Sequence, residues 1–230
     1  MYKKTIACLA NSRKPPSGRC IAGKEIGAEG FGAWVRPVSD RLTHEVSEEE
    51  RRYEDGSKAQ LLDIIAIPLK EPASSDFQVE NHTLDDDHYW ERVGHVDWKS
   101  VQKAADAFDA GFWCSAESTW HGVNDKLSEQ VARHCKSSLK LIVVPHLQIT
   151  VHREEGYNAP GRRRVRGSFS YQGSQYKLSV TDPVVEESYL GRGDGDYDIV
   201  DAALCISLGE IWNGYAFRLI ASVITKDRCR

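Results

Sequence analysis

Residues 164–190, RVRGSFSYQGSQYKLSVTDPVVEESYL, decide the fold that this sequence predicts. Polar and apolar side chains alternate over 164–171 and again over 175–181, which is the period of a strand with one buried face. The turn 172–174 lies between these runs, so they are predicted to form a hairpin. Asp182 and Pro183 follow, a pair typical of a helix start, and a short helix is predicted over Val184–Leu190.

Strands are predicted on both sides of this unit. Leu139–Arg153 is expected to form one long strand bent at Pro145, and Ala202–Leu208 and Tyr215–Thr225 close the chain. The predicted order is therefore three strands, a helix and two strands. It matches the five-stranded Greek-key OB barrel, which commonly carries a helix between its third and fourth strands. Another small β-barrel or a β-sandwich is the alternative.

The first half repeats this order of elements. A short helix is predicted at Ser47–Tyr53 from the polar run SEEERRY. The strands predicted around it are Lys4–Ala10, Arg19–Lys24, Phe31–Val38, Leu61–Leu69 and Phe77–Asn81.

The middle of the chain has the spacing of amphipathic helices. Helices are predicted over Asp97–Phe108 and Asp125–Cys135 and are expected to pack the two halves together without a hinge. The side chains expected to be buried there are Val101, Phe108, Leu127 and Val131. The predicted fold class is therefore mainly β with a helical middle (α+β), as two OB-like small β-barrels in tandem. Residues 1–84 form the first barrel, 85–138 a helical bridge and 139–230 the second barrel.

Composition narrows the class of protein. The 230 residues carry 30 basic and 34 acidic side chains, a net charge of −4, which disfavours a general cationic nucleic-acid binder but permits a local basic site. The apolar runs are too short to span a bilayer, so no membrane contact is expected and a cytoplasmic location is predicted. The six cysteines form no CxxC pair; we expect free thiols, with Cys8 and Cys205 buried.

Several segments together resemble a known family. They are NSRKPPSGRCIAGKEI (11–26), GAWVRPVS (32–39), LLDIIAIPL (61–69), QVEN (78–81), SVTDP (179–183) and LCISLGEIWNGYAFRLIASVI (204–224). In this order they are similar to the dual OB-containing domain family of bacterial proteins, over nearly the whole chain. The resemblance implies two OB-like barrels and recognition of nucleic acid or a nucleotide, and it brings no catalytic residue.

The first barrel offers a basic loop and a mixed strand face as candidate binding groups. Residues 1–24 contain six basic side chains and no acidic one. Arginines on a stiff loop suit bidentate contact with phosphate. Trp34 and Arg36 share one face of a strand, where Trp34 either stacks on a base or packs in the core. The candidate ligand-binding residues of this half are Ser12, Arg13, Lys14, Arg19, Trp34, Arg36, and the amides Gln78 and Asn81.

The second barrel offers a denser basic run. Alternation places Arg164 and Arg166 on one strand face with Ser168, Lys177 and Ser179, and it places Phe169, Tyr171 and Leu178 inside the barrel. A face of arginine, lysine and hydroxyl groups suits phosphate or sugar contacts. Trp212, in the last loop, either stacks on a base or packs under the barrel end. The candidates of this half are Arg162, Arg163, Arg164, Arg166, Lys177 and Trp212.

The leading hypothesis is a non-enzymatic module that binds nucleic acid through these basic loops and the face of strands two and three. One alternative is a sensor of a small nucleotide or nucleotide-derived signal in bacterial defence or regulation, with a partner effector protein. The other is a metal-dependent nuclease that uses the acidic run Asp85–Asp87. No catalytic residue, metal ligand or cofactor is predicted, because no triad, P-loop, zinc spacing or glycine fingerprint is present.

Overall fold

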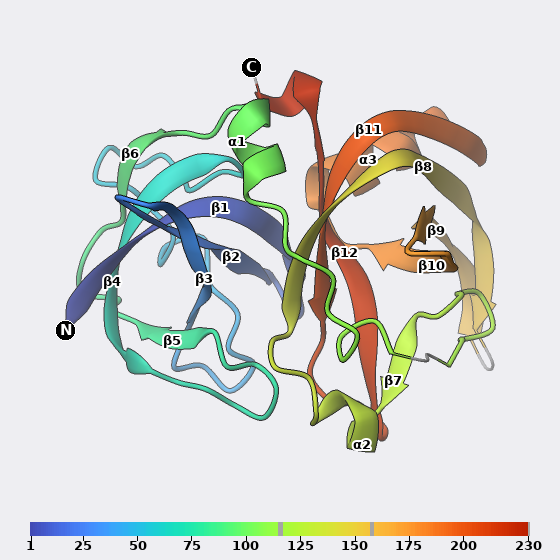
Figure 1. Cartoon of the computed structure of the whole chain (residues 1–230), viewed down its shortest axis with the longest axis horizontal. Helices are drawn as coiled ribbons and strands as arrows, with labels where there is room; N and C mark the ends of the chain where they lie inside the picture. The colour runs from blue at the N-terminus through green and yellow to red at the C-terminus, as the bar shows by residue number, and fades with distance from the viewer. Residues whose placement is uncertain (115–116, 157–158, 230) are drawn as a thin grey trace.

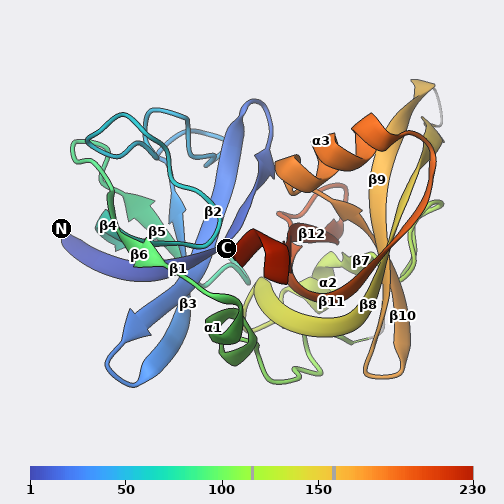
Figure 2. The same ribbon diagram turned by 90° about the horizontal axis from the view of Figure 1, so that it is seen from above.

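The computed structural model places two β-barrels side by side, and it describes residues 1–114, 117–156 and 159–229. Figure 1 shows the N-terminal barrel in blue and cyan and the C-terminal barrel in yellow to red. Seen from above in Figure 2, helix α3 lies over the second barrel, and its first turn points towards the first barrel.

The first barrel closes in the strand order β1-β2-β3-β5-β4, with β4 returning to β1. Strands β3 and β5 run parallel, and the other neighbouring pairs are antiparallel. A sixth strand, β6, adds to the edge of β4. The strands are β1 (Tyr2–Lys14), β2 (Gly18–Gly27), β3 (Gly30–Val38), β4 (Asp63–Pro72), β5 (Asn81–Leu84) and β6 (Glu91–His95).

The second barrel repeats this topology. Its order is β8-β9-β10-β12-β11 with β11 paired to β8, and its one parallel pair is β10 with β12. The strands are β7 (Lys126–Ser128), β8 (Leu139–Gly156), β9 (Ala159–Tyr171), β10 (Ser174–Val180), β11 (Gly195–Leu208) and β12 (Tyr215–Thr225). Two closed five-stranded barrels of the same connectivity confirm the predicted tandem of OB-like barrels.

Helix α3 (Pro183–Arg192) lies between the third and fourth strands of the second barrel, as predicted. Its N-cap is Asp182, whose carboxylate accepts hydrogen bonds from the main-chain N–H groups of Val184 and Val185. The first barrel lacks the matching helix. Ser47 and Glu50 exchange the hydrogen bonds of a capping box, but only turns follow them. Tyr53 N–H then donates to the Ser57 carbonyl instead of to a carbonyl earlier in the chain, as a helix would require.

The middle of the chain is less helical than predicted. Its helices are α1 (Trp98–Lys103) and α2 (Glu129–Ala132), much shorter than the predicted ranges. The first ends early because Asp106 N–H donates to the Leu141 carbonyl of β8, which draws the chain out along the second barrel. The start of the second predicted helix is instead β7, which pairs with β12.

Two further sequence predictions differ from the structure. Phe108 is 52% exposed, whereas Val101 and Leu127 are buried as expected. The strand predicted at Phe77–Asn81 lies later: Ser75 and Gln78 close a turn, and β5 begins at Asn81.

An apolar cluster is shared by the two barrels. Ala7, Leu9 and Ala22 of the first barrel pack with residues of β8, β11 and β12, and Val101 of α1 covers this contact. Ser222 Oγ donates to the Leu9 carbonyl (2.6 Å) across the same boundary. The barrels are thus joined by a buried apolar interface. This agrees with the prediction that the two halves pack together without a hinge.

The six cysteines are free thiols, and Cys8 and Cys205 are fully buried, as predicted. Among the described residues, no helix has both the length and the apolar character needed to cross a membrane.

Candidate anion-binding cleft between the barrels

Three residues predicted to bind a ligand, Arg36, Gln78 and Asn81, are buried where the barrels meet. Arg36 donates to Asn81 Oδ1 (3.2 Å) and to Ser138 Oγ (2.8 Å). Its guanidinium also lies 3.2 Å from a carboxylate oxygen of Glu80. Gln78 donates to a main-chain carbonyl of β11 (3.4 Å). Since these groups bind one another and join the barrels, we remove them from the candidate site.

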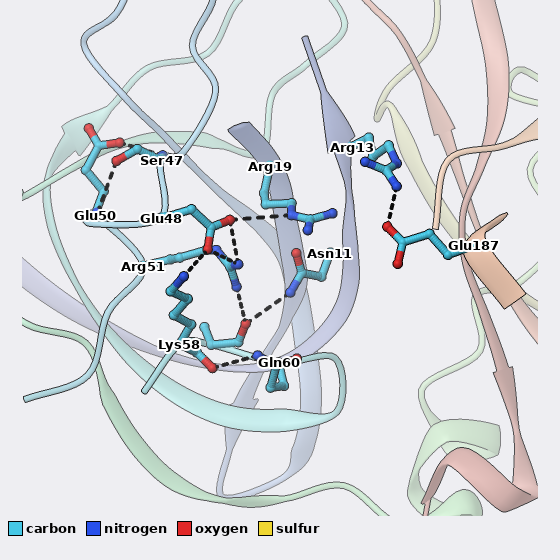
Figure 3. Close-up of polar contacts among 11 residues, drawn as sticks. Asn11, Arg13, Arg19, Ser47, Glu48, Glu50, Arg51, Lys58, Gln60 and Glu187 are labelled. Atoms are coloured by element: carbon cyan, nitrogen blue, oxygen red, sulfur yellow. Dashed lines mark hydrogen bonds and ion pairs between the residues drawn. The ribbon is translucent and has the colours of Figure 1, made fainter. Parts of the chain in front are cut away.

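The basic end of the β1–β2 hairpin faces the second barrel. Ser12 is buried, and Arg13 forms ion pairs of 2.7 and 2.5 Å with Glu186–Glu187 of α3. Figure 3 shows Arg13 reaching Glu187. Lys14 pairs with Glu210 (2.8 Å). The positive charge seen in the local sequence is therefore largely compensated by carboxylates of the other barrel.

The two candidate tryptophans differ in their surroundings. Trp34 is half-buried beside the shared apolar cluster, and its indole N–H donates to Asp106 Oδ2 (3.1 Å). The Lys24 ammonium lies 5.7 Å from the centre of its ring and 2.6 Å from the same carboxylate group. Trp212 is 66% exposed and open to a stacking partner. The packing interpretation fits Trp34, and the stacking interpretation fits only Trp212.

The β9 side chains point as predicted. A Cβ on Gly167 would touch Ile220 and Leu147 of the core, so Gly167 faces inward and its neighbour Arg166 faces outward. Phe169 is buried, as are Leu178 and Val165. The alternation in the sequence therefore places the basic and apolar faces correctly.

The outer face is nevertheless partly covered. Arg166 is only 8% exposed; its Nε donates to Glu154 Oε1 (2.5 Å), and Asp125 lies 3.6 Å away. The segment 117–126 crosses here, and Val123 exchanges main-chain hydrogen bonds of 3.1 and 3.0 Å with Lys177. Part of the face expected to bind a ligand is thus occupied by the protein itself.

The remaining arginines of β9 divide into paired and free groups. Arg163 pairs with Asp194 (2.6 Å). Within the described residues, Arg162 and Arg164 have no ion-pair partner. Burial and the neighbouring charge of Arg162 lower the pKa of Arg164. Only these two predicted cations of the strand are available to an anion.

A cleft of about 140 Å³ lies between the barrels. It is bordered by β1, β2 and the loop before β4 on one side, and by the start of α3 and the C-terminal segment on the other. Its lining residues are Asn11, Arg19, Arg51, Gln60, Leu61, Leu62, Asp182, Pro183, Val184 and Arg228.

Positive charge is in excess around this cleft. Arg51 Nη2 donates to both carboxylate oxygens of Glu48, at 2.7 Å each, and Arg19 Nε lies 3.9 Å from the same group. Figure 3 shows both guanidinium groups beside this one carboxylate. Arg228 pairs with Asp182 (2.6 Å). With the Lys58 ammonium, 2.7 Å from Glu48, four cationic groups lie against two carboxylates, which leaves positive charge in excess.

The pKa shifts follow this arrangement. Burial, followed by repulsion from Arg51, lowers the pKa of Arg19. Burial alone would raise the pKa of Glu48, but hydrogen bonds from Arg51 and Lys58 outweigh it and bring that pKa to about 2. Glu48 is therefore ionised at neutral pH and neutralises Arg51 more closely than Arg19, so Arg19 carries the excess charge.

Three of the residues that line the cleft carry buried polar atoms without hydrogen-bond partners. They are Arg19 Nη1, Arg51 Nε and Asn11 Oδ1, none of which has a hydrogen-bond partner among the described residues. Asn11 Nδ2 is fixed by the Ala59 carbonyl (3.0 Å), which leaves Oδ1 as the free end of that amide. A buried donor or acceptor without a partner costs about 1–3 kcal/mol, so these atoms favour a polar ligand. The two arginine nitrogens are donors and the Asn11 oxygen is an acceptor. Together they suit a ligand in which an anionic group is attached to a group that carries a hydroxyl.

The acidic run Asp85–Asp87 is engaged in structural contacts. Asp85 is buried and accepts a hydrogen bond from His88 Nδ1 (3.0 Å), while Asp86 pairs with Lys70 (2.7 Å). Within the described residues, the group with metal-ligand geometry lies elsewhere, in the second barrel. The run therefore gives no support to a nuclease.

The sequence predicts a binding role for Arg19 but not for three of its neighbours in the cleft. Asn11 adjoins the basic loop, and the strand alternation that places it beside Arg13 was a signal for it. Arg51 and Arg228 lie in a turn-rich segment and at the C-terminal end, and no local pattern singles them out.

Two barrels of identical strand order, joined by an apolar interface and bordering a charged cleft, define a tandem OB-fold protein. The model of the dual OB-containing domain family matches residues 4–223, and the chain belongs to this family. Comparison with curated proteins finds no match, and comparison with solved structures finds none.

Proposed function

We propose that this protein is a non-enzymatic module that recognises a small nucleotide through its phosphate in the cleft between the barrels. The observation that carries the proposal is the unpaired Nη1 of Arg19, which is buried beside a second guanidinium and an unpaired amide oxygen. A phosphate oxygen would pair with Arg19 and relieve its repulsion from Arg51. A ribose hydroxyl would donate to Asn11 Oδ1.

The size of the cleft supports a compact ligand end. Pockets that enclose a drug-sized molecule measure roughly 300–1,000 Å³, whereas this cleft measures about 140 Å³. It therefore accommodates a phosphate and part of a sugar, with the base outside. The excess of positive charge is confined to this small cleft, which suits a single phosphate better than a long polyanion.

The proposal is tested by calorimetric titration of the whole protein with 5′-AMP and, in parallel, with adenosine. Arg19→Gln should weaken 5′-AMP binding by about 10- to 100-fold, the value of one charge-assisted hydrogen bond. Adenosine should bind weakly to both proteins. Arg162→Gln, an equal change on an exposed arginine outside the cleft, is the control and should bind 5′-AMP normally. Equal affinities for wild type and Arg19→Gln would refute the cleft.

Nucleic acid is the second candidate ligand, supported by the unpaired Arg162 and Arg164 on β9 and by the exposed Trp212. In this case the double change Arg162→Gln and Arg164→Gln should weaken binding of a labelled 20-nucleotide single strand, and Arg19→Gln should not. The salt dependence should be steep for the strand and shallow for 5′-AMP, because a strand releases more counterions. A strand that binds with steep salt dependence while 5′-AMP does not bind would favour this candidate over the first.

A further inference from the structure

Three potential metal ligands meet on the outer face of the second barrel. His152 and Glu154 are alternate residues of β8, so their side chains lie on the same face of the sheet. His121 approaches from the segment 117–126. One ligand atom from each of these three side chains lies within 4.8 Å of the others.

The histidines have nitrogen atoms free for a metal. His121 Nε2 lies 3.3 Å from the Glu155 carbonyl oxygen, which favours the tautomer with its proton on Nε2 and a lone pair on Nδ1. In metal sites a ligating imidazole commonly makes such a bond through its other nitrogen. His152 Nδ1 is buried and has no hydrogen-bond partner in the part of the chain that the structure describes. The two rings are 6.1 Å apart between their centres.

The carboxylate is held in place by an arginine. Glu154 is only 9% exposed at its side chain, and it accepts from Arg166 Nε (2.5 Å) and Nη2 (3.0 Å). A carboxylate has about four lone-pair positions, so a bidentate arginine leaves capacity for a metal. Glu154 Oε1 lies 3.7 Å from His152 Nε2.

The segment that brings His121 to this place is itself fixed. Thr119 donates to both oxygens of Asp125, through its main-chain N–H (2.7 Å) and its Oγ1 (2.6 Å). Asp125 in turn lies 3.6 Å from Arg166, the residue that holds Glu154. Arg166 thus lies between Glu154 and the aspartate that fixes the segment carrying His121.

We propose that His121, His152 and Glu154 bind a divalent transition-metal ion of the Zn²⁺ class. Two imidazoles and one carboxylate form a recurrent set of three protein ligands for zinc, with a fourth position left to water or another ligand. Zinc–ligand distances of about 2.0–2.2 Å require the three side chains to draw together by small rotations. The site is separate from the cleft, and it does not depend on the proposed nucleotide.

The experiment is a titration of the whole, chelator-treated protein with Zn²⁺ against a chromophoric competing chelator. Wild type should bind one equivalent, and His121→Ala and His152→Ala should each lower the affinity by at least about 100-fold, since loss of a ligand exceeds the 10- to 100-fold effect of an outer-shell change. His146→Ala is the matched control. His146 lies on the same face of β8, pairs with the exposed Asp198 (2.9 Å), and should leave affinity unchanged.

Co²⁺ binding tests the donor set independently. Visible bands of a tetrahedral or five-coordinate ion without thiolate charge-transfer absorption would support histidine and carboxylate ligands. Thiolate absorption would assign the metal to cysteines and overturn the proposal. The proposal would also be overturned if wild type bound Zn²⁺ no more tightly than His152→Ala does. The same holds if His146→Ala lost as much Zn²⁺ affinity as His152→Ala. If His152→Ala loses its circular dichroism spectrum, His152→Gln decides by the same criterion.

Discussion

Replacing Arg36 by methionine removes one partner of the buried Arg36–Glu80 ion pair, which lies in the first barrel where it meets the second. Arg36 and Glu80 are 3% and 4% exposed, and the change leaves the carboxylate of Glu80 with Ser138 as its remaining partner. Breaking such a pair costs about 3–5 kcal/mol, because an uncompensated charge stays buried. For a chain of this length 1 kcal/mol shifts Tm by about 2–4 °C, so the expected fall is about 6–20 °C.

Thermal unfolding followed by circular dichroism measures this effect, and two companion variants interpret it. The double variant Arg36→Met with Glu80→Gln removes both charges and should recover at least half of the lost stability. Arg41→Met breaks the more exposed pair with Glu50 and should cost less than about 1 kcal/mol. A Tm of Arg36→Met within about 2 °C of wild type, or a double variant less stable than the single one, would refute the assignment of a buried charge pair.

Two other predictions concern close packing and thiol chemistry. Gly23→Ala should destabilise the protein by at least about 1–3 kcal/mol, because its Cβ would lie 1.9 Å from the Ala7 carbonyl oxygen. Gly27→Ala is the control, because its Cβ would meet no atom within 4 Å. Equal urea unfolding midpoints for the two variants would contradict this reasoning. Burial raises the pKa of Cys8 from 9.0 to about 12, so the thiol should resist alkylation at pH 8 until the protein unfolds. As pH rises, the thiol ionises in the unfolded chain before it ionises in the folded one. From pH 9 to about 12 the wild type should therefore lose about 1.4 kcal/mol of unfolding free energy per pH unit relative to Cys8→Ala. Parallel profiles of unfolding free energy against pH for the two proteins would exclude the raised pKa.

Local patterns in the sequence predict the strands well. The hairpin of β9 and β10 follows from alternation and a turn, and α3 follows from Asp182 and Pro183, since all of these signals lie within a few residues. The order of elements then limits the barrel topology. The helix predicted at Ser47–Tyr53 is wrong although its capping box forms. The reason is that Tyr53 N–H bonds forward to the Ser57 carbonyl, which makes a turn instead of a helix.

The candidate site is harder to predict, because a basic side chain in the sequence does not reveal its partner. Arg13 finds its carboxylates more than 170 residues away, and Arg166 finds one on another strand and one in the covering segment. Such pairs exist only in the folded tertiary structure, where residues distant in the sequence meet. The incomplete pairing of Arg19 is likewise visible only in the folded structure, because there Glu48 bonds more closely to Arg51.

The apolar cluster shared by the barrels has a consequence for how the protein unfolds. Leu9 on one side and Leu141, Cys205 and Ile224 on the other are fully buried in one continuous interior. Separating the halves would expose these side chains at about 25 cal/mol per Å² of apolar surface, so neither half melts without weakening the other. We therefore expect the two barrels to unfold as one cooperative unit, with a single calorimetric transition. A ligand bound between them raises the stability of the entire chain rather than that of one barrel.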